Sequence, residues 1–286
     1  MTDFLLATTS HYGITSVSKL LDTGWHCTGV ITSTPRLVGR HRTPTPTPAA
    51  VWAQEQHLPI YLVDKKITPD LQTQLPACDW LIVADFGYYL PSWLINFPRQ
   101  LAVNIHPSRL PAYRGASPGQ AVLLHGDTQS AVSFITLATQ MDAGDILDQI
   151  PFAVNQTWTA TDYYDFAFRL AAKHLPQLLT AYTAGSITPQ TQTGTPTFAP
   201  KITKQDAFID FATLFDPILA AAHERAIRAY QPWPLAWTIV PTAKGQKRLQ
   251  LLSAHLKNDQ LVLDQVRLEG ETAKPWASVQ PKILNT

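Results

Sequence analysis

Two side chains near the end of one apolar run, Asn104 and His106, are of types that can stabilise a developing negative charge. The run reads LAVNIHPSRLP (101–111), and alternate residues of a strand share a face, so the amide and the imidazole point to the same side. A second apolar run leads into ATQMDAGDIL (138–147), which places Asp142 on a glycine-containing loop. An amide, an imidazole and a carboxylate together suit acyl transfer. The competing interpretation is an ordinary polar strand end with a solvated turn.

The stretches before residue 107 alternate between strand-like and helix-like patterns. They read FLLATT, ITSVSKLLDTG, CTGVITS, PAAVWAQEQH, IYLVD, DWLIVAD and LAVNIH. Such alternation predicts an α/β fold with an open, mostly parallel sheet covered by helices. Ligands of such sheets bind beyond the carboxyl ends of the strands. Asn104 and His106 lie at such an end.

Nucleotide cofactors are the natural alternative for this architecture. A dinucleotide site needs a glycine-rich first turn, whereas the first turn here reads TTSHYG with Gly13 alone. No sequence ending in Gly-Lys-Ser/Thr follows a strand either. We therefore exclude nicotinamide, flavin and P-loop nucleotide cofactors.

Composition indicates a globular protein with room for two domains. The chain has 286 residues, of which 45% are hydrophobic and 15% charged, with a net charge of +1. Its two cysteines, Cys27 and Cys78, provide neither a disulfide framework nor a metal-binding spacing. No segment has the length and apolarity of a membrane span or the pattern of a secretory signal. We expect a cytoplasmic monomer without a bound metal.

The run AVNIHPSRLPAYRGASPGQ (102–120) resembles the signature of the formyltransferases that use 10-formyltetrahydrofolate. Other segments are similar to the family members that formylate methionyl initiator tRNA: RHRTPTPTPAAVWAQEQHLPIYLVD (40–64), CDWLIVADFGYYLP (78–91), APKITKQDAFIDF (199–211) and RAIRAYQPWPLAW (225–237). The resemblance implies that Asn104, His106 and Asp142 are catalytic. It also implies a 10-formyltetrahydrofolate donor, an initiator methionyl-tRNA acceptor and a role in translation initiation.

For the folate, the resemblance implies contacts from two loops. The residues concerned are Ser108, Arg109, Leu110, Pro111, Asp85, Phe86 and Gly87. Two departures affect this region. The first turn reads ATTSHYGI (7–14) where the family usually has Gly-Thr-Pro, and Arg109 replaces a leucine in the family's Ser-Leu-Leu-Pro.

Basic residues suggest the tRNA contacts. Arg36, Arg40 and Arg42 lie in VITSTPRLVGRHRTPTPTP (30–48), where we expect the prolines to preclude regular structure. The family resemblance implies that this loop reaches the tRNA acceptor end, and the guanidinium group suits phosphate and base recognition. Arg225 and Arg228 share a face of a predicted helix, and Lys247 follows near a loop. Solvation, or packing beside tryptophans, is the alternative role.

Patterning also predicts how the chain is divided. A helix is expected over 159–185, kinked or split at Pro176, followed by a Thr/Pro/Gln-rich linker. The expected domains are 1–186, a Rossmann-like formyltransferase domain, and 204–286, joined by the linker 187–203. Short strands around WTIV, RLQLLSAHL and QLVLDQV make the second domain small and β-rich. The family resemblance implies that it is an OB-like β-barrel that binds tRNA.

Two other functions remain open. A formyltransferase acting on an amino sugar nucleotide or another small amine would share the catalytic trio but would not require the basic loop and the barrel. A non-catalytic tRNA-binding protein is the second alternative, although Asn104, His106 and Asp142 have no evident role in folding.

Overall fold

The computed structural model describes residues 2–39 and 42–283, and the chain forms two compact units. The first contains Met1–Gly115, Ala131–Phe152 and Tyr164–Phe198. The second contains Ala116–Ser130, Ala153–Tyr163 and Ala199–Thr286. Packing therefore groups two internal segments with the C-terminal part, whereas the domains expected from sequence were contiguous. The functional boundaries 1–186, 187–203 and 204–286 stay predictions.

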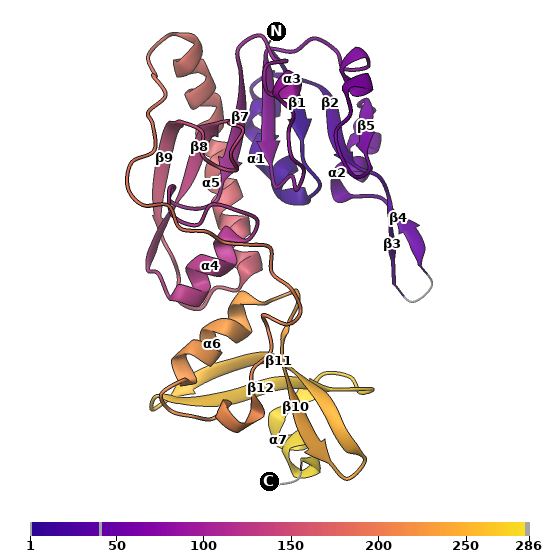
Figure 1. Cartoon of the computed structure of the whole chain (residues 1–286), viewed down its shortest axis with the longest axis vertical. Coiled ribbons are helices and arrows are strands. Elements are labelled where there is room, and N and C mark those ends of the chain that lie inside the picture. The colour runs from indigo at the N-terminus through magenta and orange to yellow at the C-terminus, as the bar shows by residue number, and fades with distance from the viewer. Residues whose placement is uncertain (1, 40–41, 284–286) are drawn as a thin grey trace. The chain divides into compact units, whose positions relative to one another are not determined.

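A seven-stranded sheet forms the centre of the first unit, in the order β5-β2-β1-β6-β7-β8-β9 (Figure 1). Its strands are β1 (Asp3–Ala7), β2 (His26–Ser33), β5 (Ile60–Val63), β6 (Trp80–Ala84), β7 (Leu101–His106), β8 (Gln129–Thr136) and β9 (Ile146–Ala153). The β5-β2-β1-β6-β7 part is parallel, and β8 runs antiparallel to β7. The expected mostly parallel α/β sheet is confirmed.

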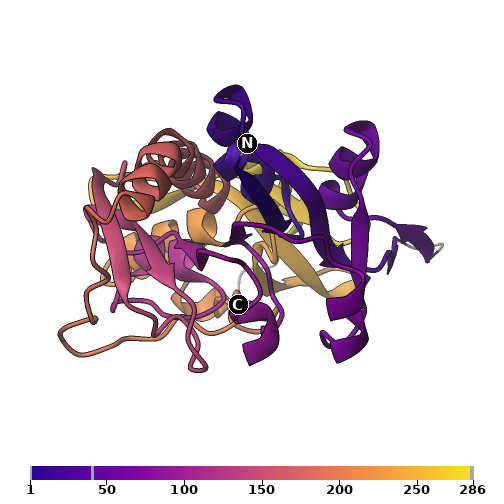
Figure 2. The same ribbon diagram turned by 90° about the horizontal axis from the view of Figure 1, so that it is seen from above.

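Apolar side chains hold the helices of this unit against the sheet. The helices are α1 (His11–Asp22), α2 (Pro48–Glu55), α3 (Ser92–Ile95) and α5 (Ala160–Thr183), with a 3-10 turn at Pro69–Thr73. On α5, Phe166 packs against Phe152 of β9, with ring centroids 5.2 Å apart, and the two elements lie side by side in Figure 2. Burying such faces supplies most of the stability of a helix.

Pro176 lies inside α5 without dividing it, so the expected split is wrong. Proline costs about 3 kcal/mol within a helix because it removes one hydrogen bond and crowds the preceding turn. Leu175, Leu178 and Leu179 around it are buried to 4% exposure or less. Each buried leucine contributes about 1.5–3 kcal/mol, so packing outweighs the penalty.

The basic segment after β2 is a hairpin, not an irregular loop. Strands β3 (Arg36–Val38) and β4 (Thr43–Thr45) pair antiparallel, with Leu37 opposite Pro44. The expectation that prolines preclude regular structure here is wrong, because a proline is tolerated where its missing N–H faces solvent at the edge of a sheet. All residues of both strands are exposed, and the hairpin projects from the sheet in Figure 1.

The second unit is built on an antiparallel four-stranded sheet in the order β10-β11-β12-β13. Its elements are α4 (Pro118–His125), α6 (Ala220–Ala229), β10 (Ala236–Thr242), β11 (Gly245–Lys257), β12 (Gln260–Leu268), β13 (Lys274–Pro275) and α7 (Trp276–Val279), with 3-10 turns at Phe211–Thr213 and Gln280–Lys282. Alternate strand residues, among them Val240, Leu249 and Val266, form its core. A small β-rich unit is thus confirmed, and the closed OB-like barrel remains a prediction.

Candidate functional site

Strand β7 carries Asn104 and His106 to the carboxyl end of the parallel sheet. It pairs with β6 on one side, where Asn104 lies opposite Val83, and with β8 on the other, where His106 lies opposite Ser133. Both neighbours are buried, which fixes the register and therefore the direction of the two polar side chains. Asn104 is half-buried and His106 is buried, and Pro107 follows the strand end.

The Asp142 carboxylate is the centre of the polar cluster. Asn104 Nδ2 donates to its Oδ1 (3.2 Å), and the Gly115 N–H donates to its Oδ2 (2.8 Å). His106 Nδ1 lies 3.7 Å from the same Oδ2. The structure therefore brings together all three side chains that the sequence singled out for chemistry, from positions as distant as 104 and 142.

His106 is enclosed by acceptors. Its Nε2 lies 3.0 Å from the Tyr113 carbonyl oxygen, while Nδ1 faces the Asp142 carboxylate, and the side chain is only 5% exposed. Tyr113 is itself held by its N–H, which donates to Thr197 Oγ1 (2.9 Å).

Asp142 adopts a left-handed backbone conformation, with φ of 51°. Aspartate is one of the few residues that enters this region, but the conformation still costs about 1 kcal/mol or more for a residue with a Cβ. Gln192 stabilises it from the main-chain side, because its Nε2 donates to the carbonyl oxygens of Asp142 (2.8 Å) and Gly144 (2.7 Å). The Gln192 Oε1 in turn accepts from Arg114 Nε (3.2 Å) and NH2 (2.7 Å).

Gly144 fixes the other side of the same loop. A Cβ at this position would lie 1.7 Å from the Thr136 carbonyl oxygen, so only glycine allows the loop to approach the end of β8. Thr136 and Asp145 also exchange bonds: Thr136 N–H donates to the Asp145 carbonyl and Asp145 N–H donates to Thr136 Oγ1, both at 2.9 Å.

Sequence patterns missed Gln192 and Gly115 as parts of this site. Gln192 lies in a Thr/Pro/Gln-rich segment that we interpreted as a linker, and nothing in its sequence distinguishes it from Gln190. Gly115 contributes only its backbone N–H, which every residue other than proline carries. Gly144, two residues after Asp142, was the one available signal.

In the segment 108–111, which we expected to contact folate, Ser108 and Leu110 form hydrogen bonds within the protein. Ser108 is fully buried, and its hydroxyl donates to the Ala112 carbonyl (2.7 Å). Leu110 is 3% exposed, and its carbonyl accepts from Gln149 Nε2 (2.8 Å). Arg109 is exposed and Pro111 is half-buried. Ser108 and Leu110 therefore shape the loop, and Arg109 and Pro111 remain accessible.

The second expected folate loop, Asp85 to Gly87, follows β6 and lies at the carboxyl ends of the parallel strands, as Asn104 and His106 do. Asp85 has a φ of 47°, and its carbonyl accepts from the Thr9 N–H (3.3 Å) and Thr9 Oγ1 (3.2 Å). The altered first turn is thus tied to this loop. Gly13 makes that turn possible, since a Cβ there would lie 2.1 Å from Thr8 Oγ1.

The expected RNA-binding residues fall into two groups. Arg36 and Arg42 lie exposed on the β3–β4 hairpin, and Arg40 lies outside the described residues. Arg225 and Arg228 are engaged within the second unit. Arg225 Nε donates to the Leu124 carbonyl (3.0 Å), and Arg228 donates to Glu224 and to the Trp158 carbonyl (2.6 Å).

Arg228 is only 11% exposed at its side chain, so its bonds would have to break before it could contact RNA. Lys247, on β11, is half-exposed.

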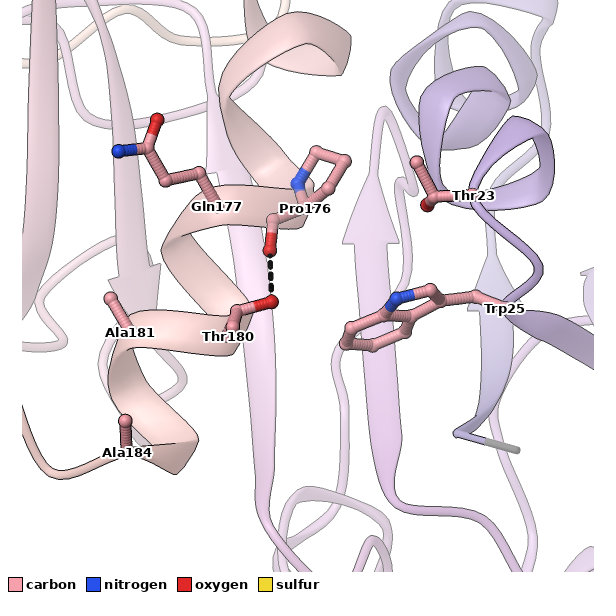
Figure 3. Close-up of a pocket in the computed structure, with 7 residues that line it drawn as sticks. All are labelled: Thr23, Trp25, Pro176, Gln177, Thr180, Ala181 and Ala184. Atoms are coloured by element: carbon pink, nitrogen blue, oxygen red, sulfur yellow. Dashed lines mark hydrogen bonds between the residues drawn. The ribbon is translucent and has the colours of Figure 1, made fainter.

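A pocket of about 380 Å³ in the first unit is not connected with this chemistry (Figure 3). Trp25 and Pro176 line it, and Thr180 donates to the Pro176 carbonyl at its wall (2.8 Å). None of its lining residues is titratable. Trp25 precedes β2, so the pocket lies at the amino ends of the parallel strands, away from Asn104.

Other classes of site have no structural support in the described ranges. No helix within 2–39 and 42–283 is long and apolar enough to cross a membrane. The same residues contain no group of three or more His, Cys, Asp or Glu side chains placed to hold a metal ion.

An open, mostly parallel α/β sheet with a polar cluster at the carboxyl ends of its strands is a Rossmann-like fold. The family model described as "Formyl transferase" matches residues 4–179, and the chain belongs to the formyltransferase family.

Solved structures with the same fold include proteins with different names and bound ligands. Methionyl-tRNA formyltransferase from Clostridium thermocellum is 17% identical, with a TM-score of 0.59 over 94% of this chain and 99% of that one. An N-formyltransferase from Helicobacter canadensis, solved with folinic acid and dTDP-3-aminofucose, is 16% identical, with a TM-score of 0.63 over 90% and 89%. HypX from Aquifex aeolicus with tetrahydrofolic acid is 14% identical, with a TM-score of 0.63 over 96% of this chain and 46% of that one.

Proposed function

We propose that the protein transfers a formyl group from 10-formyltetrahydrofolate to the α-amino group of methionyl initiator tRNA, giving N-formylmethionyl-tRNA for translation initiation. One observation supports formyl transfer as the reaction. Asn104, His106 and Asp142 meet at the carboxyl end of β7 in a chain of the formyltransferase family. We further propose that it works as a cytoplasmic monomer, with an OB-like C-terminal domain that binds tRNA.

In the proposed reaction, the neutral amine of the acceptor attacks the formyl carbon. A C–N bond forms, negative charge develops on the formyl oxygen, and the bond to N10 of the folate then breaks. The amine loses one proton and N10 gains one, so charge and atoms balance. Donors placed at the formyl oxygen accelerate such a reaction because they bind the charge that develops in the transition state.

Asn104 is the proposed donor to the formyl oxygen. A side-chain amide has two N–H groups, and one of them donates to Asp142 Oδ1. That bond fixes the plane of the amide, so the second N–H has a defined direction. A donor oriented before substrate arrives need not reorganise during the reaction.

His106 is the proposed proton carrier and positive charge of the site. Its Nε2 meets the Tyr113 carbonyl at 3.0 Å, and a substrate atom that replaces this acceptor would receive the same N–H. Asp142 keeps the ring oriented and balances its charge, since its Oδ2 lies 3.7 Å from Nδ1.

We propose that the folate binds against the loop after β6 and the accessible part of 108–111. Phe86 packs against Tyr88, with ring centroids 5.1 Å apart, which supplies an apolar wall beside the backbone of Asp85 and Gly87. A flat pterin ring suits a mixture of apolar wall and backbone polar groups. The HypX structure with tetrahydrofolic acid and the Helicobacter canadensis structure with folinic acid support a folate at this fold.

The choice of tRNA as the proposed acceptor depends on observations outside the catalytic cluster. The exposed Arg36 and Arg42 on the hairpin suit RNA phosphate. The structural match to the Clostridium thermocellum methionyl-tRNA formyltransferase covers 94% of this chain and 99% of that one. An amino sugar nucleotide is the second candidate, because the Helicobacter canadensis relative was solved with dTDP-3-aminofucose.

Mass spectrometry of both acceptors tests the proposal. Purified protein and 10-formyltetrahydrofolate are incubated with initiator Met-tRNA in one reaction and with dTDP-3-aminofucose in another. Formylmethionine after hydrolysis of the tRNA supports the proposal, and a formylated sugar alone would replace it with the second candidate. Product from neither acceptor, with folate bound, would contradict both. Asn104→Ala is the matched variant that should lose product from whichever acceptor is used.

A further inference from the structure

The outward face of the second sheet carries an unusual row of side chains. Trp237 of β10 lies opposite Gln250 of β11, which lies opposite Arg267 of β12. Arg248 is two residues before Gln250 and therefore shares this face. The residues between them on these strands, such as Leu249 and Leu251, are buried on the core side.

Both arginines of this row are held in place by neighbours that leave donors unused. The Arg248 guanidinium lies over the Trp237 ring, 4.3 Å from its centroid. Arg267 Nε donates to Gln250 Oε1 (2.7 Å). Within the described chain, the arginine ion pairs involve Arg99, Arg169 and Arg228, so neither Arg248 nor Arg267 is paired with a carboxylate. Glu269 accepts from the Arg248 backbone N–H (3.2 Å) rather than from its side chain. Positioned guanidinium groups with free N–H donors are the usual means of binding a phosphate.

The same residues line a pocket of about 310 Å³. Its wall also includes Lys204 and the segment 232–235, where Trp233 is 51% exposed. Trp237 is already covered by Arg248 and packs against Phe208, with ring centroids 4.8 Å apart. Trp233 is therefore the indole that an incoming ring can reach.

We propose that this pocket binds a phosphorylated nucleoside, with the phosphate on Arg248 and Arg267 and the base against Trp233. Lys204 adds a third positive charge at the pocket wall. A base stacked on an aromatic side chain beside cationic donors is the arrangement by which single nucleotides are held without sequence-specific contacts. The same chemistry is present in a free nucleotide and in a single-stranded stretch of RNA. The site lies within the second unit and does not depend on formyl transfer.

Isothermal titration of the full chain with adenosine 5′-monophosphate, adenosine and inorganic phosphate tests the proposal. We expect the nucleotide to bind at least about tenfold more tightly than either part alone. Arg248→Gln and Arg267→Gln should each weaken it by about tenfold, as expected for loss of a charge-assisted hydrogen bond. Trp233→Ala should weaken it by a similar factor and Trp233→Phe should retain most of the affinity.

Lys257→Gln is the matched control, because Lys257 is an exposed cation at the end of β11 that does not line the pocket. An equal loss in this variant, or affinity for inorganic phosphate equal to that for the nucleotide, would overturn the proposal. So would nucleotide binding that neither arginine variant changes.

Titration with a single-stranded oligoribonucleotide distinguishes RNA from a free nucleotide as the ligand of this pocket. Binding at least about tenfold tighter than the mononucleotide, and lost in Arg248→Gln, assigns the site to RNA, whereas equal affinities assign it to a free nucleotide. Absence of binding by both probes would refute the site.

Discussion

Gln192 holds Asp142 in place although the two residues are 50 positions apart: its Nε2 donates to the Asp142 carbonyl oxygen at 2.8 Å. The same amide group also donates to Gly144 and accepts from Arg114, so it connects both sides of the loop that carries the carboxylate. Catalytic geometry depends on such supporting contacts as much as on the reacting groups.

We predict that Gln192→Ala lowers the turnover number for formyl transfer by about tenfold or more, because a small displacement of a catalytic group is costly. Steady-state kinetics with folate and acceptor varied separately provide the measurement. The Michaelis constant for folate should change little, which distinguishes positioning from binding. Gln190→Ala is the control from the same segment, since among residues 2–39 and 42–283 the Gln190 side chain bonds only locally, to the Thr188 carbonyl (3.1 Å). Equal losses in the two variants would refute a specific role for Gln192.

The Asn104–Asp142 bond leads to a second prediction. Asn104→Ala should lose about 10²-fold in turnover, as removal of an oxyanion donor does in other enzymes. Asp142→Asn should lose a comparable factor, because the new amide cannot accept from both Asn104 and Gly115 in the observed way. The double variant should be far less impaired than the product of the two losses. Strictly multiplicative losses would show that the residues act independently.

The hairpin arginines should affect tRNA rather than folate. Replacing Arg36 and Arg42 with alanine should reduce the slope of log affinity for tRNA against log salt by about one to two units. Folate affinity and thermal stability should be nearly unchanged, because both side chains are exposed. Lys65→Ala with Lys66→Ala removes the same charge from another exposed segment of the first unit. Superimposable salt titrations for wild type and the Arg36/Arg42 variant would exclude these residues from the tRNA contact.

The two cysteines should resist thiol reagents in the native protein. Burial raises the pKa of the Cys27 thiol to about 11 and that of Cys78 to about 12, and only the thiolate reacts. Iodoacetamide at pH 8 should therefore modify neither residue until urea is added, as read by intact mass. Modification of the native protein at the rate of a free thiol would contradict the burial.

The raised pKa values of the two thiols also predict how the stability of the folded protein depends on pH. The unfolded thiols ionise near pH 9 and the folded ones only at higher pH, so these thiols stabilise the native state fully below pH 9, and this stabilisation declines as the pH rises toward 11–12. The urea midpoint should fall between pH 8 and pH 10, and by less in the Cys27→Ala, Cys78→Ala variant.

The sequence was sufficient for the parallel sheet and for the convergence of Asn104, His106 and Asp142. Strand periodicity and Gly144, two residues after Asp142, are local signals, and sheet topology brings the carboxyl ends of parallel strands together in a regular way. The continuous helix through Pro176 and the paired β3–β4 strands could not be predicted locally, because in both places packing or solvent exposure outweighs the usual effect of proline.

Gln192 was missed for a different reason. Its partners, Arg114, Asp142 and Gly144, are 48 to 78 positions away, and a single sequence does not reveal hydrogen bonds over such separations. Backbone donors at the site, such as the Gly115 N–H, cannot be predicted from residue type either, because every residue except proline carries one.

The division of the chain into interleaved units has a consequence for how the protein can be modified or recombined. The second unit takes Ala116–Ser130 and Ala153–Tyr163 from within the first, so neither unit is a contiguous stretch of gene. A single crossover in the region encoding 187–203 would separate α4 from α6, whose Arg225 bonds to the carbonyl of Leu124. Exchanging residues 204–286 between relatives by one such crossover should therefore yield incomplete cores. Productive chimeras should require the two internal segments to be exchanged together with the C-terminal part.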